Sequence, residues 1–582
     1  MKLSPEQEKA AYTESKRALV IAGGGSGKTR TMIARIKHLI ETCNVSPYEI
    51  LCLTFTRKAA GEIKDRLQKV IGGASKRITA GTIHSVALNY LQRFGELIGL
   101  KPGKITVYGS LEEEFLLKEV AKELGYHNGK TWRGVKKGEV MAAFYVFYTT
   151  GSINLEHDKA NYLMAAFFAR CKENNALTYG TILTEFKRLI PKISKFMGLR
   201  HVLSDECQDQ DPLQWQILND ICQLCNASLF AVGDPRQSIY SFRGADPEYL
   251  VRNKHLFDIY NLKDNYRSSA NIVEAANNLI GHNGGELGEP MQAIRQDWVN
   301  VVSFPDMDSQ TIINFIKRMK HVIDFENTAI LARNHWLLEK LSRLLTESNI
   351  KHEYIGKKTA MTRSEPFRRF HAFLKLIVNP FDNFSFLLIK DYLGITQTEY
   401  SDIRMLSCVE FQSRFETWKA VHVNETYTWQ KWFKSSENGD MATVIDWMKD
   451  VEFGFGTSDI FEFVYGWMLD HYDGTIEQYL SWLAVWDISD EVKEESEGLM
   501  LMTCHAAKGL EFSTVIAIGL NEGIFPDKRD IASNNLTDSR RLAYVCFTRA
   551  KDQLILTSRP LKKNDDLFIE NPVSRFIIEA IG

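Results

Sequence analysis

Residues 17–29, RALVIAGGGSGKT, decide the fold, because a short apolar run leads directly into a glycine-rich loop that ends in lysine and threonine. Apolar residues at helical spacing follow the loop, at Met32, Ile36, Leu39 and Ile40. Strand, loop and helix in this order are the setting of a phosphate-binding loop. Its glycines let backbone N–H groups approach phosphate oxygens, while Lys28 can neutralise phosphate charge and the Thr29 hydroxyl can ligate Mg²⁺. The strict pattern has glycine where this chain has Ala22, and the loop alone is generic among nucleotide-binding proteins.

The alternation of apolar runs with helical segments recurs along the chain. One set of runs lies at 50–54, 201–204 and 228–232, and a second set lies at 328–332, 499–503, 515–518 and 553–557. Strands that alternate with helices predict parallel sheets, so we expect two α/β units. The segments 91–195 and 378–492 lack the strand pattern and predict mainly helical insertions. Seven of the eleven tryptophans lie between Trp418 and Trp486, where helical core is favoured over a base-stacking role.

Length and composition indicate a folded multidomain protein. A chain of 582 residues is too long for one hydrophobic core. Its N-terminus is charged at once, unlike a signal peptide, and no apolar stretch approaches the ~20 residues of a membrane span, so we expect a soluble cytoplasmic protein. The net charge of −2 provides no overall positive field, so any contact with nucleic acid must come from a local groove.

The nine cysteines show no disulfide framework. Only Cys222 and Cys225 have CxxC spacing, and no second pair or nearby histidines complete a zinc site. Two cysteines on a partly buried helix in a reducing compartment are favoured over a metal or redox site.

Adjacent acids at a predicted strand end complement the loop. Asp205 could hold Mg²⁺ through water, and Glu206 could polarise the attacking water. Such a pair alone is usually a surface turn, but together with the upstream loop it predicts an NTPase. Phosphoryl transfer also needs positive charge at the γ-phosphate, for which Arg267 and Arg549, each in a dense polar cluster, are candidates.

The full set of motifs resembles the UvrD/Rep/PcrA-like superfamily 1 DNA helicases, in the right order over nearly the whole chain. The resemblance rests on residues 3–7, 22–29, 54–60, 81–85, 205–209, 233–245, 265–268, 503–512, 540–544 and 548–550. It implies two RecA-like P-loop motor domains, 1–90 with 196–268 and 269–377 with 493–582, each with one of the helical insertions.

The resemblance also implies roles in an ATP site between the motor domains. Gln7 would read adenine, with Tyr266 and Arg30 flanking the ring. Gln237 would sense the γ-phosphate and Glu511 would meet the ribose. The loop Ala22, Gly23, Gly24, Gly25, Ser26, Gly27, Lys28 and Thr29 would hold the phosphates, Thr29 and Asp205 would hold Mg²⁺, and Arg267 and Arg549 would be the arginine fingers.

A single-strand groove is implied as well. Its residues would be Phe55, Thr82, His84, Tyr240, Phe242, Arg243, Thr503 and His505. Aromatic rings stack on any base, and arginine, threonine and histidine hold phosphates. Strand-end packing is the alternative for Phe55 and Tyr240.

The chain departs from the family at several places. Phe242 stands where tryptophan is usual, and Asp538-Ser539 replaces a more acidic pair. The second insertion is shorter than usual, little chain follows residues 574–576, and the loop at 559–568, in the position of the family's strand-separating pin, is polar apart from Phe568. Partner predictions from relatives are therefore weakened.

The resulting prediction is an ATP-dependent helicase that moves 3′ to 5′ along single-stranded DNA and unwinds duplex at single/double-strand junctions, in repair, recombination or replication. Its cofactors would be ATP and Mg²⁺, and its partners replication or repair proteins, as a monomer or a dimer. One alternative is a translocase that displaces proteins without unwinding. Another is a nucleotide-switched DNA-binding protein, against which the intact Lys28, Glu206, Arg267 and Arg549 argue.

Overall fold

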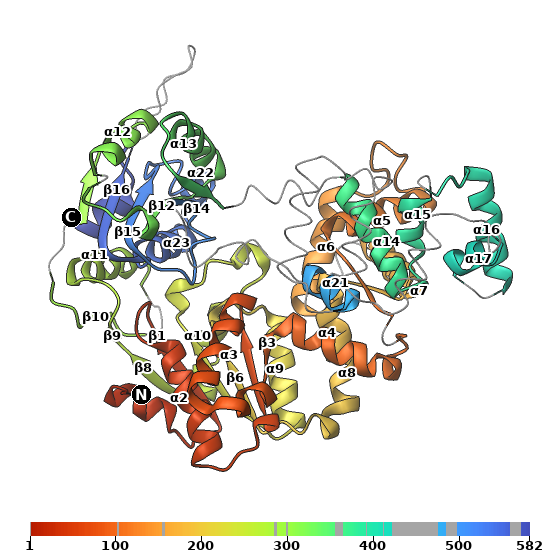
Figure 1. Cartoon of the computed structure of the whole chain (residues 1–582), viewed down its shortest axis with the longest axis horizontal. Coiled ribbons are helices and arrows are strands. Elements are labelled where there is room, and N and C mark those ends of the chain that lie inside the picture. Colours follow the sequence, from red (N-terminus) through yellow and green to blue (C-terminus); the bar gives the residue numbers. More distant parts are fainter. Residues whose placement is uncertain are drawn as a thin grey trace. The chain divides into compact units, whose positions relative to one another are not determined.

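A computed structural model describes residues 2–101, 104–153, 158–284, 288–297, 301–305, 307–319, 321–355, 365–390, 393–410, 413–421, 475–484, 498–558 and 572–582 (Figure 1). The chain forms two compact units. The sheet unit comprises Met1–Thr82, Met197–Lys357 and Asp487–Gly582, and the helical unit comprises Ile83–Phe196 and Lys358–Trp486. The loop at 559–568, predicted as the strand-separating pin, lies outside the described residues.

The sheet unit contains a first six-stranded sheet in the order β3-β2-β6-β7-β1-β8, with every neighbouring pair parallel. The four inner strands are short runs that are mostly buried, as in parallel sheets covered on both faces, whereas the edge strands β3 and β8 are more polar and more exposed. They are β1 (Arg17–Ala22), β2 (Ile50–Thr54), β3 (Thr79–Thr82), β6 (His201–Ser204), β7 (Ser228–Gly233) and β8 (Asp258–Leu262). The accompanying helices are α1 (Pro5–Ala11), α2 (Lys28–Glu41), α3 (Arg57–Ile71), α9 (Pro212–Leu224) and α10 (Glu248–Arg252).

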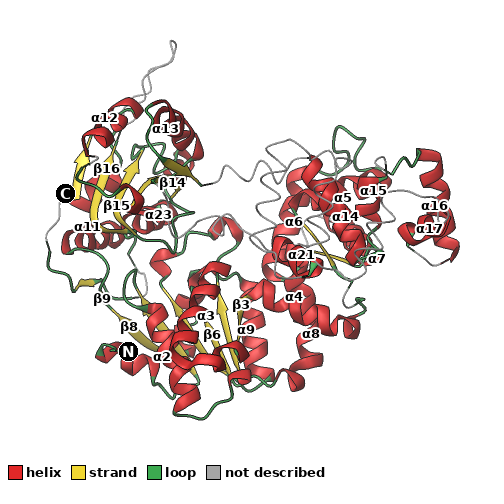
Figure 2. Cartoon of the chain, viewed as in Figure 1, coloured by secondary structure: helices red, strands yellow, loops and turns green. Residues whose placement is uncertain are grey.

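A second six-stranded parallel sheet has the order β11-β16-β15-β12-β14-β13. Its strands are β11 (Val301–Phe304), β12 (Thr328–Ala332), β13 (His352–Tyr354), β14 (Leu499–Thr503), β15 (Phe512–Ile518) and β16 (Ala550–Thr557). Its helices are α11 (Ala270–Gly281), α12 (Ser309–Met319), α13 (His335–Glu347), α22 (Lys528–Ala532), α23 (Thr537–Phe547) and α24 (Arg575–Ile581). Figure 2 shows both sets of strands flanked by helices. The predicted α/β fold with two parallel sheets is confirmed.

Two segments join the sheets within this unit. A short pair, β9 (Asp264–Asn265) and β10 (Gln292–Ala293), lies on the connection from β8 to the second sheet. Ile239 and Tyr240, which follow β7 of the first sheet, belong to the hydrophobic core cluster of the second sheet. The loop after β7 is therefore anchored in the opposite half.

The helical unit overlaps most of the two segments predicted as insertions, 91–195 and 378–492. Its helices are α4 (Ile83–Phe94), α5 (Ser110–Glu123), α6 (Lys137–Thr150), α7 (Asp158–Glu173), α8 (Tyr179–Met197), α14 (Glu365–Val378), α15 (Asn383–Ile389), α16 (Gln397–Glu410), α17 (Arg414–Val421) and α21 (Ile476–Ala484). It also contains two short parallel strands that the sequence pattern missed, β4 (Thr106–Tyr108) and β5 (Ala176–Thr178).

Buried polar contacts join the two insertions into one unit. The Tyr108 hydroxyl donates to an Asp382 carboxylate oxygen at 2.5 Å, and Asn379 Nδ2 donates to Thr106 Oγ1 at 2.9 Å. Trp418 is buried with phenylalanines in a core cluster, which confirms the packing interpretation for that tryptophan. None of the described helices is both long and apolar enough to span a membrane.

Candidate nucleotide and DNA sites

The glycine-rich loop joins β1 to α2. Gly25 and Gly27 have φ values of +76° and +83°, a region that favours glycine. A Cβ atom on Gly25 would also lie 2.5 Å from Arg267 Cβ, so a side chain there is excluded on two grounds. Ser26 Oγ donates to the Gly23 carbonyl at 2.7 Å. The loop thus places the N-terminus of α2 and the Lys28 side chain where an anion binds well.

Lys28 is paired with the acidic motif. Its Nζ lies 3.0 Å from Glu206 Oε1, and Glu206 adopts a φ of +48° directly after β6 and Asp205. Burial and the neighbouring Glu206 charge raise the pKa of Asp205. Burial alone would raise the pKa of Glu206 as well, but Lys28 and Lys508 outweigh it and lower that pKa. Glu206 is therefore the ionised partner that holds the lysine.

A hydrogen-bonded network connects Glu206 to the end of β7. Gln208 Nε2 donates to Glu206 Oε2 at 2.6 Å, and its Oε1 accepts from the Asp234 backbone N–H at 3.0 Å. Gln237 Nε2 donates to Asp234 Oδ2 at 2.9 Å. The predicted γ-phosphate sensor Gln237 is thus linked to the predicted base through Gln208, which the sequence interpretation had not singled out.

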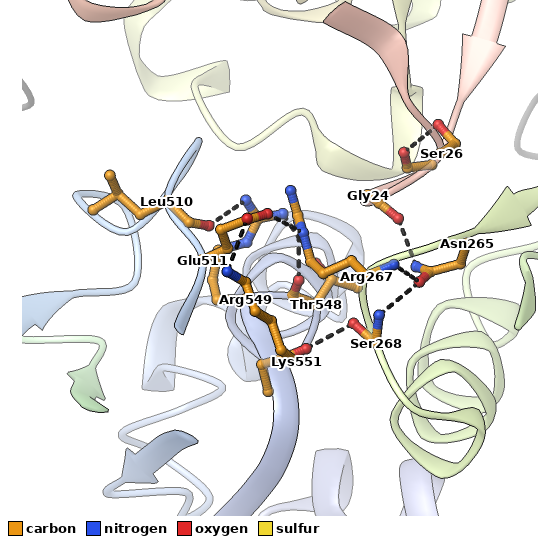
Figure 3. Close-up of polar contacts among 12 residues, drawn as sticks. Gly24, Ser26, Asn265, Arg267, Ser268, Leu510, Glu511, Thr548, Arg549 and Lys551 are labelled. Atoms are coloured by element: carbon orange, nitrogen blue, oxygen red, sulfur yellow. Dashed lines mark hydrogen bonds and ion pairs between the residues drawn. The ribbon is translucent and has the colours of Figure 1, made fainter. Parts of the chain in front are cut away.

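A cavity of about 920 Å³ lies between the two sheets of this unit. The first sheet contributes the loop from Gly23 to Arg30 together with Glu206 and Gln237. The opposite side contributes Arg267, Glu511, Arg549 and Lys551, which are drawn in Figure 3. A Cβ atom on Gly24 would lie 3.5 Å from Arg267 Nη1 and 3.5 Å from Arg549 Nη2. The structure therefore brings both predicted arginine fingers to the phosphate-binding loop.

Arg549 is buried and held by three acceptors. Its Nε donates to the Val545 carbonyl at 3.0 Å, its Nη1 to the Leu510 carbonyl at 3.1 Å and its Nη2 to Thr548 Oγ1 at 3.1 Å. Burial and the nearby Arg267 lower its pKa to about 9, so the guanidinium keeps its charge at neutral pH. These hydrogen bonds hold the guanidinium in one position on the cavity wall, as electrostatic catalysis requires.

The residues predicted to contact adenine also meet at the loop. Gln7 is buried at N3 of α1, where its Oε1 accepts from the Ser4 N–H at 3.0 Å and its Nε2 donates to the Ser26 carbonyl at 2.9 Å. The Tyr266 N–H donates to the Gly25 carbonyl at 3.0 Å, and its ring is 38% exposed in the cavity wall that Arg30 shares. Gln7 thus links the loop to α1.

A buried ion pair crosses between the sheets. Lys508 Nζ, from the turn after β14, pairs with the Asp209 carboxylate and donates to the Gln237 carbonyl at 2.7 Å. Both charged side chains are almost completely buried. Sequence interpretation missed this contact, although each residue lies within a motif it had marked.

Most of the predicted DNA-contacting residues lie near strand ends of the two sheets. Phe55 follows β2, and Thr82 ends the neighbouring β3, where it is paired in register with Thr54. The Phe55 and Tyr240 rings are stacked at 4.8 Å, and Phe242 meets His505 edge-on at 5.5 Å. Tyr240 is 9% exposed in the second core, as strand-end packing predicts, whereas Phe242 is 62% exposed.

Arginine and lysine both bring positive charge to this cluster, and Lys508 Nζ lies 5.1 Å from the Tyr240 ring centre. The Arg243 guanidinium lies 5.3 Å from the Tyr240 ring centre and 5.8 Å from that of Phe242. Burial first, and nearby cations such as Arg333 second, lower the pKa of His505 to about 4. His505 is therefore neutral at physiological pH. Thr503 ends β14, and its Oγ1 accepts from the Ala506 N–H at 3.3 Å.

His84 belongs to the helical unit. Its ring stacks on that of Tyr179 at 3.8 Å, and Tyr179 is 47% exposed. Burial lowers the pKa of His84 to about 3. The exposed aromatic beside His84 was not among the sequence predictions, because it follows β5, a strand that the pattern did not reveal.

The family can be decided from the match to known sequence families. The model of the UvrD/REP helicase N-terminal domain matches residues 3–258. The model of the UvrD-like helicase C-terminal domain matches residues 260–426 and 469–559. The chain belongs to the UvrD/Rep family of helicases. The predicted family and enzyme class, an ATP-dependent DNA helicase, are confirmed.

Individual relatives match over most of their own length. The ATP-dependent DNA helicase Rep of Buchnera aphidicola subsp. Acyrthosiphon pisum is 27% identical, with 100% of this chain and 98% of the relative covered. The ATP-dependent DNA helicase PcrA of Bacillus subtilis is 26% identical over 99% of this chain and 85% of the relative. The ATP-dependent DNA helicase Rep of Escherichia coli is 26% identical over 100% and 94%, respectively. This UvrD/Rep family member is thus similar to helicases of both names, at 26–27% identity.

Proposed function

We propose that this UvrD/Rep family helicase moves 3′ to 5′ along single-stranded DNA and unwinds duplex at single/double-strand junctions. The observation that carries the proposal is the cavity whose one wall holds Lys28 and Glu206 and whose other wall holds Arg267 and Arg549. ATP in this cavity would attract both walls, and hydrolysis would remove the γ-phosphate that draws them together. The direction of movement rests on the resemblance alone.

In this proposal each wall has its own chemical task. Lys28 and the N–H groups at the start of α2 hold the phosphates, Glu206 orients the attacking water, and the two arginines stabilise charge that develops during phosphoryl transfer. When ATP binds, the Lys28 ammonium must leave Glu206 and pair with phosphate. The Glu206 carboxylate is then free to orient the attacking water. Gln7 would give up at least one of its two side-chain hydrogen bonds, to Ser4 or Ser26, and form a hydrogen bond to adenine instead.

Mg²⁺ fits the residues beside the phosphates. Thr29 offers a hydroxyl oxygen at the first turn of α2, and Asp205 offers a carboxylate at the end of β6. Oxygen ligands of these kinds, completed by phosphate and water, are those that Mg²⁺ prefers. A bound Mg²⁺ would neutralise phosphate charge, and Asp205 would hold it through water.

Coupling to DNA would use the contacts between the sheets. The loop after β7 carries Gln237 at the cavity and Tyr240, Phe242 and Arg243 at the aromatic cluster. Lys508 ties that same loop to the second sheet. Movement of Gln237 in response to the γ-phosphate would therefore be passed along a few residues of one loop to those proposed to bind single-stranded DNA.

Forked DNA tests the proposal most directly. We expect unwinding of a duplex with a 3′ single-stranded tail, no unwinding with only a 5′ tail, and ATPase stimulation by single-stranded DNA. Lys28→Ala should abolish both activities, whereas Lys37→Ala, on the exposed face of the same helix, should preserve them. Protein displacement without strand separation would instead establish a translocase, and turnover that ignores DNA would exclude the motor.

We assign the enzyme to DNA repair, recombination or replication, the processes that expose single strands, and place it in the cytoplasm as a monomer or dimer. Single-stranded DNA and junctions are its proposed partners, along with replication or repair proteins. Sedimentation with and without a forked DNA would determine the working oligomeric state. A disruption strain that tolerates DNA damage and replication stress normally would contradict the pathway assignment.

A further inference from the structure

Glu511 binds two cations at once on the cavity wall. Its Oε2 lies 2.6 Å from Arg267 Nε, and its Oε1 lies 2.9 Å from Lys551 Nζ (Figure 3). Arg267 Nη1 also donates to the Thr548 carbonyl at 3.2 Å. One of the two proposed arginine fingers is therefore partly neutralised by a carboxylate, whereas Arg549 has backbone and hydroxyl acceptors instead.

The backbones beneath these side chains are held in a fixed frame. Arg295 Nη1 donates to the Arg267 carbonyl at 2.8 Å and to the Lys551 carbonyl at 3.4 Å. The Ser269 N–H donates to the same Lys551 carbonyl at 3.0 Å. Arg295 is itself paired with Asp552 at 2.8 Å. Any exchange at Glu511 can thus proceed by side-chain rotation without moving the strands.

We propose that Glu511 holds Arg267 back until ATP is present, and that Lys551 is the positioning residue that lets the arginine leave. This inference rests on the proposed function of Arg267 as a ligand of the γ-phosphate. When Arg267 turns to phosphate, Lys551 remains as the counter-ion of Glu511. The carboxylate then stays neutralised at the cavity wall rather than repelling the nucleotide.

The charge balance gives the direction of the effect. Glu511, Arg267 and Lys551 together carry a net charge of +1, so one positive charge is available to phosphate at all times. Without Lys551 the remaining pair is neutral, and Arg267 becomes the only side chain of the described residues in a direct ion pair with Glu511, so its release is harder. The side chains are 44%, 16% and 35% exposed in that order, so solvent screening limits the effect. For such pairs we expect about a two- to fivefold change in rate.

Steady-state ATPase with saturating single-stranded DNA provides the test. Lys551→Met should lower kcat about two- to fivefold and leave KM for ATP within about twofold, because catalysis and not initial binding needs free Arg267. Lys551→Arg should restore kcat. Lys37→Met removes a lysine of similar exposure that faces Glu41 at 3.6 Å outside the cavity, and should leave both constants unchanged.

A double-mutant cycle separates this exchange from a general loss of positive charge. In a Glu511→Gln background Arg267 is already released, so adding Lys551→Met should no longer lower kcat. An equal loss in both backgrounds, or a rise in KM alone, would overturn the proposed role of Lys551. If the wild-type protein itself shows no DNA-stimulated ATPase, the proposed function fails instead, so the two failures are distinguishable.

Discussion

The two six-stranded sheets share an architecture but differ in the chemistry at their strand ends. After β1 and β6, the first sheet carries a phosphate-binding loop and the acids Asp205 and Glu206. The second sheet has no such loop in its described residues and instead presents Arg549 and Lys551 beside Glu511. The two sheets are thus similar platforms. Residues after strands of the first sheet are proposed to hold the nucleotide, whereas residues at the starts of β15 and β16 in the second sheet are proposed to sense its charge.

The largest expected effect is that of Lys28→Ala, which removes the lysine that the first sheet contributes to the cavity. ATPase should fall below detection with and without DNA, because the phosphates lose their principal charged ligand and Glu206 loses its partner. Fluorescent ATP titration should show weakened binding as well. Retention of wild-type turnover would mean that Lys28 does not hold phosphate.

Arg549→Ala removes an arginine from the second sheet's side of the cavity and leaves the residues of the first sheet unchanged. Turnover should fall about a thousandfold, the scale of a lost arginine finger, with nucleotide affinity changed far less. Arg549→Lys should recover little, because the guanidinium is held by three acceptors that an ammonium cannot match together. Arg529→Ala, at an exposed position of α22, is the matched control. Equal losses in both variants would contradict a specific role for Arg549.

The contact between the platforms can be tested through Lys508→Met. Asp209 would lose its buried counter-ion, which costs about 3 kcal/mol of stability by analogy with other broken buried pairs. Burial, opposed by Lys508, already raises the pKa of Asp209 to about 6, so the variant should be less destabilised at pH 5 than at pH 8, where the carboxylate must ionise.

Urea unfolding at the two pH values would measure this difference. Adding Asp209→Asn removes the uncompensated charge and should recover much of the lost stability. A double variant less stable than Lys508→Met alone would show that Asp209 has a separate structural role.

The sequence predicted the first platform better than the second, for a physical reason. The loop, its lysine and its helix are contiguous, so local spacing reveals them. Apolar runs reveal eight of the twelve strands described in the two parallel sheets, but not β3, β8, β11 and β13. Lys508 with Asp209 and Glu511 with Lys551 are pairs formed by folding, and no local pattern says which charges will meet. The strands β4 and β5 were missed because three-residue strands give too little alternation to recognise.

The smallest expected effect is that of pH on DNA binding, because the two histidines proposed to contact DNA carry no charge at neutral pH. Burial lowers the pKa of His84 to about 3 and, with nearby cations, that of His505 to about 4, so both are uncharged above about pH 5. Single-strand affinity, measured by fluorescence anisotropy, should therefore be unchanged between pH 6 and 8. Arg243→Ala should instead reduce the slope of log affinity against log salt by about 0.7, the value for one phosphate on single-stranded DNA. Affinity that rose as the pH fell would show that DNA binding protonates a histidine, and the charge of the grip would then not come from arginine and lysine alone.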